Sequence, residues 1–173
     1  MIANKNIIDE IIRECAVELF TQQGTNLATG AESLDPHDYV AVIGFYGDSM
    51  RGALGIGLDR AIVSRMLESA GTDGSGGRLL EDWVGEAANQ LLGRVKNRLL
   101  GYGVTLGLAL PMVLRGVEVH LVKATAEIWQ YRFACAQGGM TIWFDARIDD
   151  GIILEPQSDP DQMAASEGGL TLF

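Results

Sequence analysis

Three polar side chains at regular spacing along one predicted helix form the most specific chemical pattern in the sequence. Residues 78–101 have helical periodicity, and at about 100° per residue the polar face collects Asp82, Glu86, Asn89 and Gly93. The carboxylates supply charge and hydrogen-bond acceptors, and the Asn89 carboxamide can both donate and accept. Gly93 costs about 1 kcal/mol of helix propensity relative to alanine, so its place on a polar face suggests close approach by a partner.

Two plainer interpretations of this helix are a solvent-exposed face and a metal site. The first is compatible with the helix taken alone. The second is disfavoured because helix-bundle di-metal sites place a histidine three residues after the glutamate, whereas Asn89 has that position after Glu86. The opposite, apolar face is predicted to be buried in the core, and it consists of Leu80, Val84, Ala87, Leu91, Val95 and Leu99.

The segment that follows the helix adds a second motif. After a turn at 101–103, the apolar segment 104–116 contains Pro111, and 21 residues lie between Asn89 and this proline. The pattern Asp82-x3-Glu86-x2-Asn89, followed by this proline and an apolar strand, resembles the signature of the CheC/CheX/FliY phosphatase family of bacterial chemotaxis. The interval is one residue shorter than the usual one, and the resemblance covers residues 6–156.

This resemblance implies a phosphatase that hydrolyses the aspartyl phosphate of a CheY-like response-regulator receiver. By the same comparison, Glu86 would form a salt bridge with a receiver lysine and Asn89 would orient the attacking water. Asp82 would support binding and Pro111 would shape the strand beside the helix. No metal or cofactor of the chain's own is implied, because the receiver carries Mg²⁺. Placing a water in line is compatible with phosphoryl transfer, which depends mainly on positioning and electrostatics.

A weak internal repeat bears on which family member the chain resembles. The predicted first helix, residues 6–20, carries Asn6-x3-Glu10-x2-Arg13 in the frame of the second-helix motif. Arg13 cannot replace a carboxamide, because it only donates and is permanently charged. The chain is therefore more similar to CheX, with one active helix, than to CheC, with two. The resemblance implies an α+β, CheC-like fold of pseudo-duplicated helix-plus-strands halves, a mainly antiparallel sheet covered by long helices, and a homodimer formed through sheet edges.

Composition limits the class of protein and its partners. The chain has 173 residues, 47% of them hydrophobic, a net charge of −10 and a pI near 4.5. We expect one domain over residues 1–156 and a flexible acidic tail over 157–173. The acidic balance disfavours nucleic acid and anionic membranes as partners. The absence of a long apolar run and of a signal-peptide pattern favours the cytoplasm.

Cysteine and histidine are too scarce to suggest other chemistry. Cys15 and Cys135 are interpreted as small hydrophobes in a reducing compartment. His37 and His120 are the two histidines, which argues against a zinc site or a serine–histidine triad. We expect His120 to be a half-exposed strand residue.

The remaining elements follow from periodicity and turn residues. Strands are predicted at 39–46 and 50–58 as an antiparallel hairpin, and a helix at 59–70 with Asp59 as its N-cap. Further strands are predicted at 111–123, 126–135 and 140–148, joined in sequence as hairpins. The glycines of the 50–58 strand do not form a nucleotide-binding motif, so we expect them to permit a tightly covered or twisted strand.

Two rival functions remain open at this point. One is a non-catalytic dimeric module that binds a receiver or a signalling scaffold through the same helix. The other is a small-molecule-binding α+β domain, suggested only by the glycine-rich strands. The intact Glu86 and Asn89 favour the phosphatase.

Overall fold

Two antiparallel hairpins lie side by side at the centre of the fold. The computed structural model describes residues 2–29, 37–69, 71, 77–119, 128–136 and 138–156. Within these residues the chain forms, in order, α1 (Ile2–Gln22), β1 (Ala28–Thr29), β2 (His37–Tyr46), β3 (Met50–Leu58), α2 (Arg60–Ser69), α3 (Gly77–Leu100), β4 (Gly107–Leu108), β5 (Met112–Val119), β6 (Ile128–Cys135) and β7 (Gly138–Ile148). None of the helices in the described part of the chain is long and apolar enough to cross a membrane.

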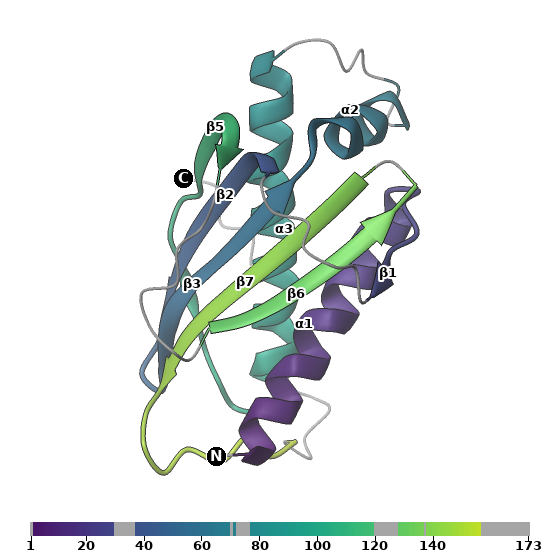
Figure 1. Ribbon diagram of the computed structural model, residues 1–173. Coiled ribbons are helices and arrows are strands. Elements are labelled where there is room, and N and C mark those ends of the chain that lie inside the picture. Colours follow the sequence, from purple (N-terminus) through teal and green to yellow (C-terminus); the bar gives the residue numbers. More distant parts are fainter. Residues whose placement is uncertain are drawn as a thin grey trace.

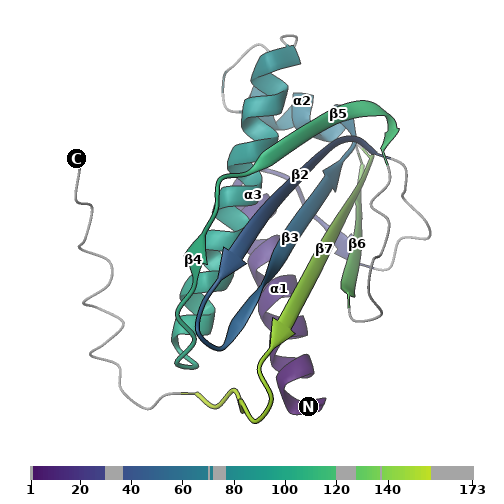
Figure 2. The same ribbon diagram turned by 90° about the vertical axis from the view of Figure 1, so that its left-hand side faces the viewer.

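The strands form one seven-stranded antiparallel sheet. Its order is β1-β6-β7-β3-β2-β4, and β5 also pairs with β2. The predicted β2–β3 and β6–β7 hairpins are confirmed by continuous registers, such as Ala41 opposite Ile56 and Tyr131 opposite Ile142. The predicted hairpin between β5 and β6 is wrong. β5 instead pairs with β2, with Val113 opposite Ala41, because the chain leaving α3 returns along the β2 side of the sheet (Figure 2).

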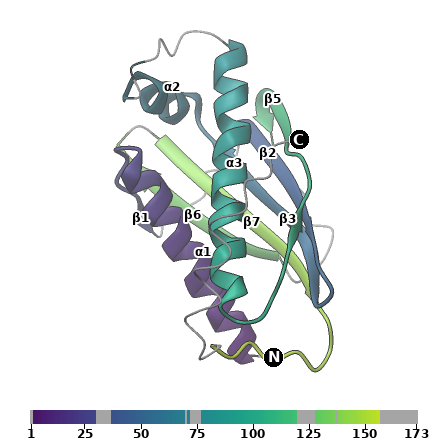
Figure 3. The same cartoon turned by 180° about the vertical axis from the view of Figure 1, so that it is seen from behind.

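The long helices cover one face of this sheet. Figure 1 shows α1 and α3 behind the strands, and Figure 3 shows the same helices in front of them from the other side. α3 packs against β2 and β3, whereas α1 reaches β6, where the Arg13 guanidinium lies 4.9 Å from the ring centroid of Tyr131. The two helices lie beside each other, and ion pairs link Arg98 of α3 with Glu14 and Glu18 of α1. Each long helix therefore covers strands from the other half of the predicted repeat.

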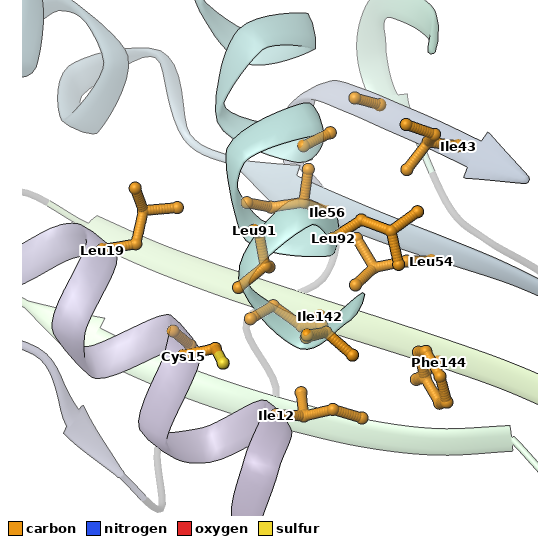
Figure 4. Packing of buried hydrophobic residues seen from close by; sticks show 14 of the residues in the cluster. Ile12, Cys15, Leu19, Ile43, Leu54, Ile56, Leu91, Leu92, Ile142 and Phe144 are labelled. Atoms are coloured by element: carbon orange, nitrogen blue, oxygen red, sulfur yellow. The ribbon is translucent and has the colours of Figure 1, made fainter. Parts of the chain in front are cut away.

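A single apolar cluster fills the layer between helices and sheet. Burial follows from the periodicity: the six predicted core residues of α3 are at most 1% exposed. In Figure 4, Ile12 and Cys15 of α1, Leu91 and Leu92 of α3 and Ile142 of β7 point into the same layer. This packing fixes the rotation of α3, and hence which of its faces remains available to solvent.

Two details around α2 differ from the predictions. β2 begins at His37, two residues before the predicted strand 39–46. The Asp59 side chain does not cap α2, because its Oδ1 lies 2.9 Å from His37 Nδ1 and its Oδ2 accepts from the Gly139 N–H at 2.7 Å. The Arg60 N–H at the start of the helix donates instead to Asp38 Oδ2, at 2.8 Å. The predicted tail 157–173 and His120 lie outside the described residues.

Candidate functional site

The outward face of α3 carries the polar stripe that the sequence predicts. Asp82 and Glu86 are exposed, and Asn89 and Gly93 are partly exposed. All four lie on the side of the helix away from Leu80, Val84 and the rest of the buried face. The stripe therefore projects into solvent from a helix whose other side is fixed in the core.

The Glu86 carboxylate accepts a hydrogen bond from a side chain of its own helix. Gln90 Nε2 donates to Glu86 Oε1 at 2.8 Å, and both side chains are exposed. An exposed contact at i,i+4 is worth only a few tenths of a kcal/mol. Glu86 is therefore oriented along the helix but can exchange this contact for a cation on another protein.

A close approach occurs one turn before Asn89, at a glycine that the sequence analysis did not single out. A Cβ at Gly85 would lie 3.2 Å from Val113 Cγ2 and 3.8 Å from Pro111 Cγ. Gly85 is buried although it lies beside the exposed Glu86. The missing side chain thus lets the start of β5 pack directly on α3. The signal in the sequence that could have indicated this contact is a glycine inside the helix, directly before Glu86.

Pro111 lies at a break in the edge of the sheet. β4 and β5 both pair with β2, with Leu108 opposite Phe45 and Met112 opposite Val42. The two residues of β2 are three positions apart in sequence, whereas their two partners are four positions apart. One extra residue is accommodated there, which is the count of a β-bulge. Proline fits this place because it has no N–H to donate to a strand ladder. Pro111 lies at this break on the side of the chain that faces Gly85 of α3.

An ion pair joins β5 to the N-terminal half of α3. Arg115 Nη1 lies 2.9 Å from Glu81 Oε1, and Arg115 is 55% exposed. Glu81 lies one position before Asp82, on the side of the helix that faces β5. Together with the contact at Gly85, this pair holds β5 alongside the polar stripe.

Gly93, in contrast, meets nothing of its own chain. A Cβ built at Gly93 has no heavy atom within 4 Å. The fold itself therefore does not require glycine at this position, and its small size is not explained by any contact that the structure describes.

A second polar cluster lies at the far side of the sheet from the helices. His37 Nδ1 faces Asp59 Oδ1 at 2.9 Å, and His37 Nε2 faces Thr141 Oγ1 at 2.8 Å. The order is that of a hydrolytic triad, but Thr141 is 0% exposed and His37 2% exposed, so a substrate has no access to the hydroxyl. A Cβ at Gly57 would lie 2.3 Å from His37 Cδ2. The glycine thus permits tight covering of β3, as predicted, and the cluster joins β2, α2 and β7.

The cysteines and the first helix offer no comparable site. Burial raises the pKa of the Cys15 thiol to about 11, so it remains protonated at neutral pH. On α1, Arg13 donates to Asp9 at 2.9 Å and lies over the Tyr131 ring, so the position equivalent to Asn89 is engaged by its own chain. No group of three or more potential metal ligands occurs among the residues that the structure describes.

Comparison with known proteins identifies relatives of both the sequence and the fold. The family model for "Chemotaxis phosphatase CheX" matches residues 39–134. No curated protein matches the chain significantly.

Several solved structures share the fold. The chemotaxis protein CheX from Vibrio vulnificus is similar with a TM-score of 0.72 and 22% identity, over 81% of this chain and 96% of that one. A CheC-like superfamily protein from Shewanella sp. PV-4 gives a TM-score of 0.68 and 18% identity, over 82% and 97%. A chain of the CheX–CheY–BeF₃–Mg²⁺ complex from Borrelia burgdorferi gives 0.63 and 15%, over 80% and 96%. At these identities the likeness concerns the fold, which is the predicted CheC-like α+β fold.

Proposed function

This chain belongs to the CheX family of chemotaxis phosphatases, and on that basis we propose that it hydrolyses the aspartyl phosphate of a CheY-like receiver domain. The observation that carries the proposal is the joint exposure of Glu86 and Asn89 on one face of a helix whose opposite face is buried. A carboxylate and a carboxamide three residues apart can enter the same pocket of another protein.

Each side chain has a role that its chemistry allows. The Asn89 carboxamide accepts a hydrogen bond from a water while donating another, and so holds the water in line with the phosphorus. It carries no charge that would repel the phosphoryl oxygens. Glu86 exchanges its contact with Gln90 for a cationic side chain of the receiver, which fixes the orientation of the two proteins. Asp82 and Gly93 contribute to the same contact surface, and Pro111 holds the neighbouring strand against α3.

The receiver is proposed to supply the rest of the reaction. Its Mg²⁺ neutralises phosphoryl oxygens, so this chain needs to bring only positioning groups. The solved CheX–CheY–BeF₃–Mg²⁺ complex from Borrelia burgdorferi, which shares this fold, supports a CheY-type protein as the partner class. We also propose a homodimer and a cytoplasmic location, and light scattering of the purified protein tests the former.

A direct assay measures the loss of phosphate from receivers. A panel of CheY-type receivers is charged with acetyl phosphate and Mg²⁺, and dephosphorylation is followed with and without this protein. We expect Asn89→Ala to lower kcat about a hundredfold, as loss of one pre-positioned polar group does elsewhere. Glu86→Ala should raise KM about tenfold, because it removes one charge pair across the interface.

The matched control is Asn97→Ala, which makes the same change at an exposed position two turns further along α3. It should leave kcat and KM unchanged. Full activity of both Asn89→Ala and Glu86→Ala would refute the proposed roles. Receiver binding without faster loss of phosphate would instead favour the non-catalytic module.

A further inference from the structure

Leu110 is the most exposed large apolar side chain in the described part of the protein. It is 90% exposed, compared with 64% for Met112 and 43% for Leu114 on the same segment. An exposed leucine of this kind contributes almost nothing to the core, because burial of apolar area is the source of its stabilising effect. Its position therefore calls for an explanation other than folding.

The backbone on both sides of Leu110 is fixed. On one side, Leu108 pairs with Phe45, and the Ala109 N–H donates to the Gly44 carbonyl at 2.9 Å. On the other side, Pro111 lies against α3 at Gly85. Leu110 occupies the bulge between these two anchors, and bulges redirect side chains out of the regular alternation of a strand. The side chain is thus presented on a rigid backbone.

The location of Leu110 places it beside the polar stripe. Pro111, its neighbour in sequence, lies beside the helix at Gly85, where an added Cβ would come within 3.8 Å of Pro111 Cγ, and Gly85 directly precedes Glu86. Asn89 lies one turn beyond Gly85, and positions four residues apart lie close to one another on the same face of a helix. Figure 2 shows the segment between β4 and β5 running along α3. A protein that receives Glu86 and Asn89 in a pocket would therefore also cover this segment.

We propose that Leu110 is an apolar anchor for the phosphorylated receiver domain that docks on α3. The inference rests on the proposed phosphatase function and extends its contact surface from the helix to the bulge. At Leu110 itself, a receiver is a better occupant than a second copy of this chain. A second copy that paired along this edge would use the regular strand β5 (Met112–Val119), because the bulge with Pro111 interrupts the row of backbone donors at Leu110.

The test compares two exposed aliphatic residues in non-helical segments. Leu110→Ser removes the anchor, and Ile153→Ser is the matched control. Ile153 is 67% exposed and lies between Ile152 and Leu154, whose backbone groups bond Asn4 near the start of α1. The substrate is the receiver of the panel above that the unmodified protein dephosphorylates fastest, and kcat, KM, oligomeric state and thermal stability are measured for each variant.

We expect Leu110→Ser to raise KM roughly tenfold with kcat and stability unchanged, because uniform binding is lost while the transition state is untouched. Ile153→Ser should change none of these. An unchanged KM for Leu110→Ser overturns the anchor and leaves the phosphatase standing. A Leu110→Ser protein that falls from dimer to monomer also overturns it, since the surface would then join two copies. If the unmodified protein dephosphorylates no receiver, the proposed function itself fails.

Discussion

Replacing Gly93 by alanine should stabilise the protein, because the glycine has no partner in its own fold. The position is inside α3, and a Cβ there meets no heavy atom within 4 Å. Alanine is favoured over glycine in a helix interior by about 1 kcal/mol, and no clash offsets this gain. For a protein of this size, such a change raises Tm by roughly 2–4 °C. Urea denaturation measures the change in the free energy of unfolding, and a thermal scan measures the change in Tm.

Gly85→Ala is the matched control in the same helix. The helix-propensity gain is the same, but the new methyl group would lie 3.2 Å from Val113 Cγ2 and 3.8 Å from Pro111 Cγ. The first contact is tighter than ordinary packing, so β5 must shift slightly and part of the gain is lost. The free energy of unfolding should therefore rise less for Gly85→Ala than for Gly93→Ala. Equal gains, or a loss for Gly93→Ala, would refute this account of both glycines.

The Gly93→Ala variant also tests whether Gly93 contributes to receiver binding. If the receiver approaches the backbone of α3 at Gly93, the added methyl group should raise KM for the phosphorylated receiver while the protein becomes more stable. Stability and function would then change in opposite directions, as expected where a residue is kept for function at the expense of stability. A stabilised protein with unchanged KM would remove Gly93 from the contact surface without affecting the structural reasoning.

Two further predictions concern buried groups outside α3. Native Cys15 should resist alkylation by iodoacetamide at pH 8, because the thiolate is the reactive species and burial raises the pKa of this thiol to about 11. Cys15 should react once the protein is unfolded in urea. Peptide mapping by mass spectrometry distinguishes it from Cys135, and rapid labelling of native Cys15 would contradict its burial. His37→Leu should lower the free energy of unfolding by about 2–3 kcal/mol, since it leaves Asp59 and Thr141 without this partner. Urea denaturation checks the value, and a change below about 0.5 kcal/mol would mean that the cluster does not hold β2, α2 and β7 together.

Helical periodicity determined much of the candidate site in advance. The buried face of α3 is the predicted one, because a repeat of 3.6 residues assigns each side chain to a side of the helix without knowledge of the partner. The polar stripe followed from the same count, so Asp82, Glu86, Asn89 and Gly93 lie where the sequence placed them. Alternation and turn residues likewise gave both central hairpins, whose paired strands are close in sequence.

Contacts between residues distant in sequence could not be derived in this way. The sequence suggested that β5 would pair with the next strand, yet it pairs with β2, because the chain leaving α3 returns along that edge. The Asp59 side chain satisfied a capping pattern locally, but His37 and Gly139, 22 and 80 residues away, take both of its oxygens. Local propensity identifies a donor or acceptor, whereas tertiary packing decides which partner it meets.

The sequence alone thus determined the long helices, the two central hairpins, the buried face of α3 and the side chains that project from it, since these depend on spacing within one segment. The short strands β1 and β4 were not predicted. Only the tertiary structure decided what lies beside that stripe. Gly85 and Pro111 are 26 positions apart and meet because β5 packs against α3. The bulge that exposes Leu110 exists only through the register of two strands against β2. A register is a relation between segments, and no single segment encodes it.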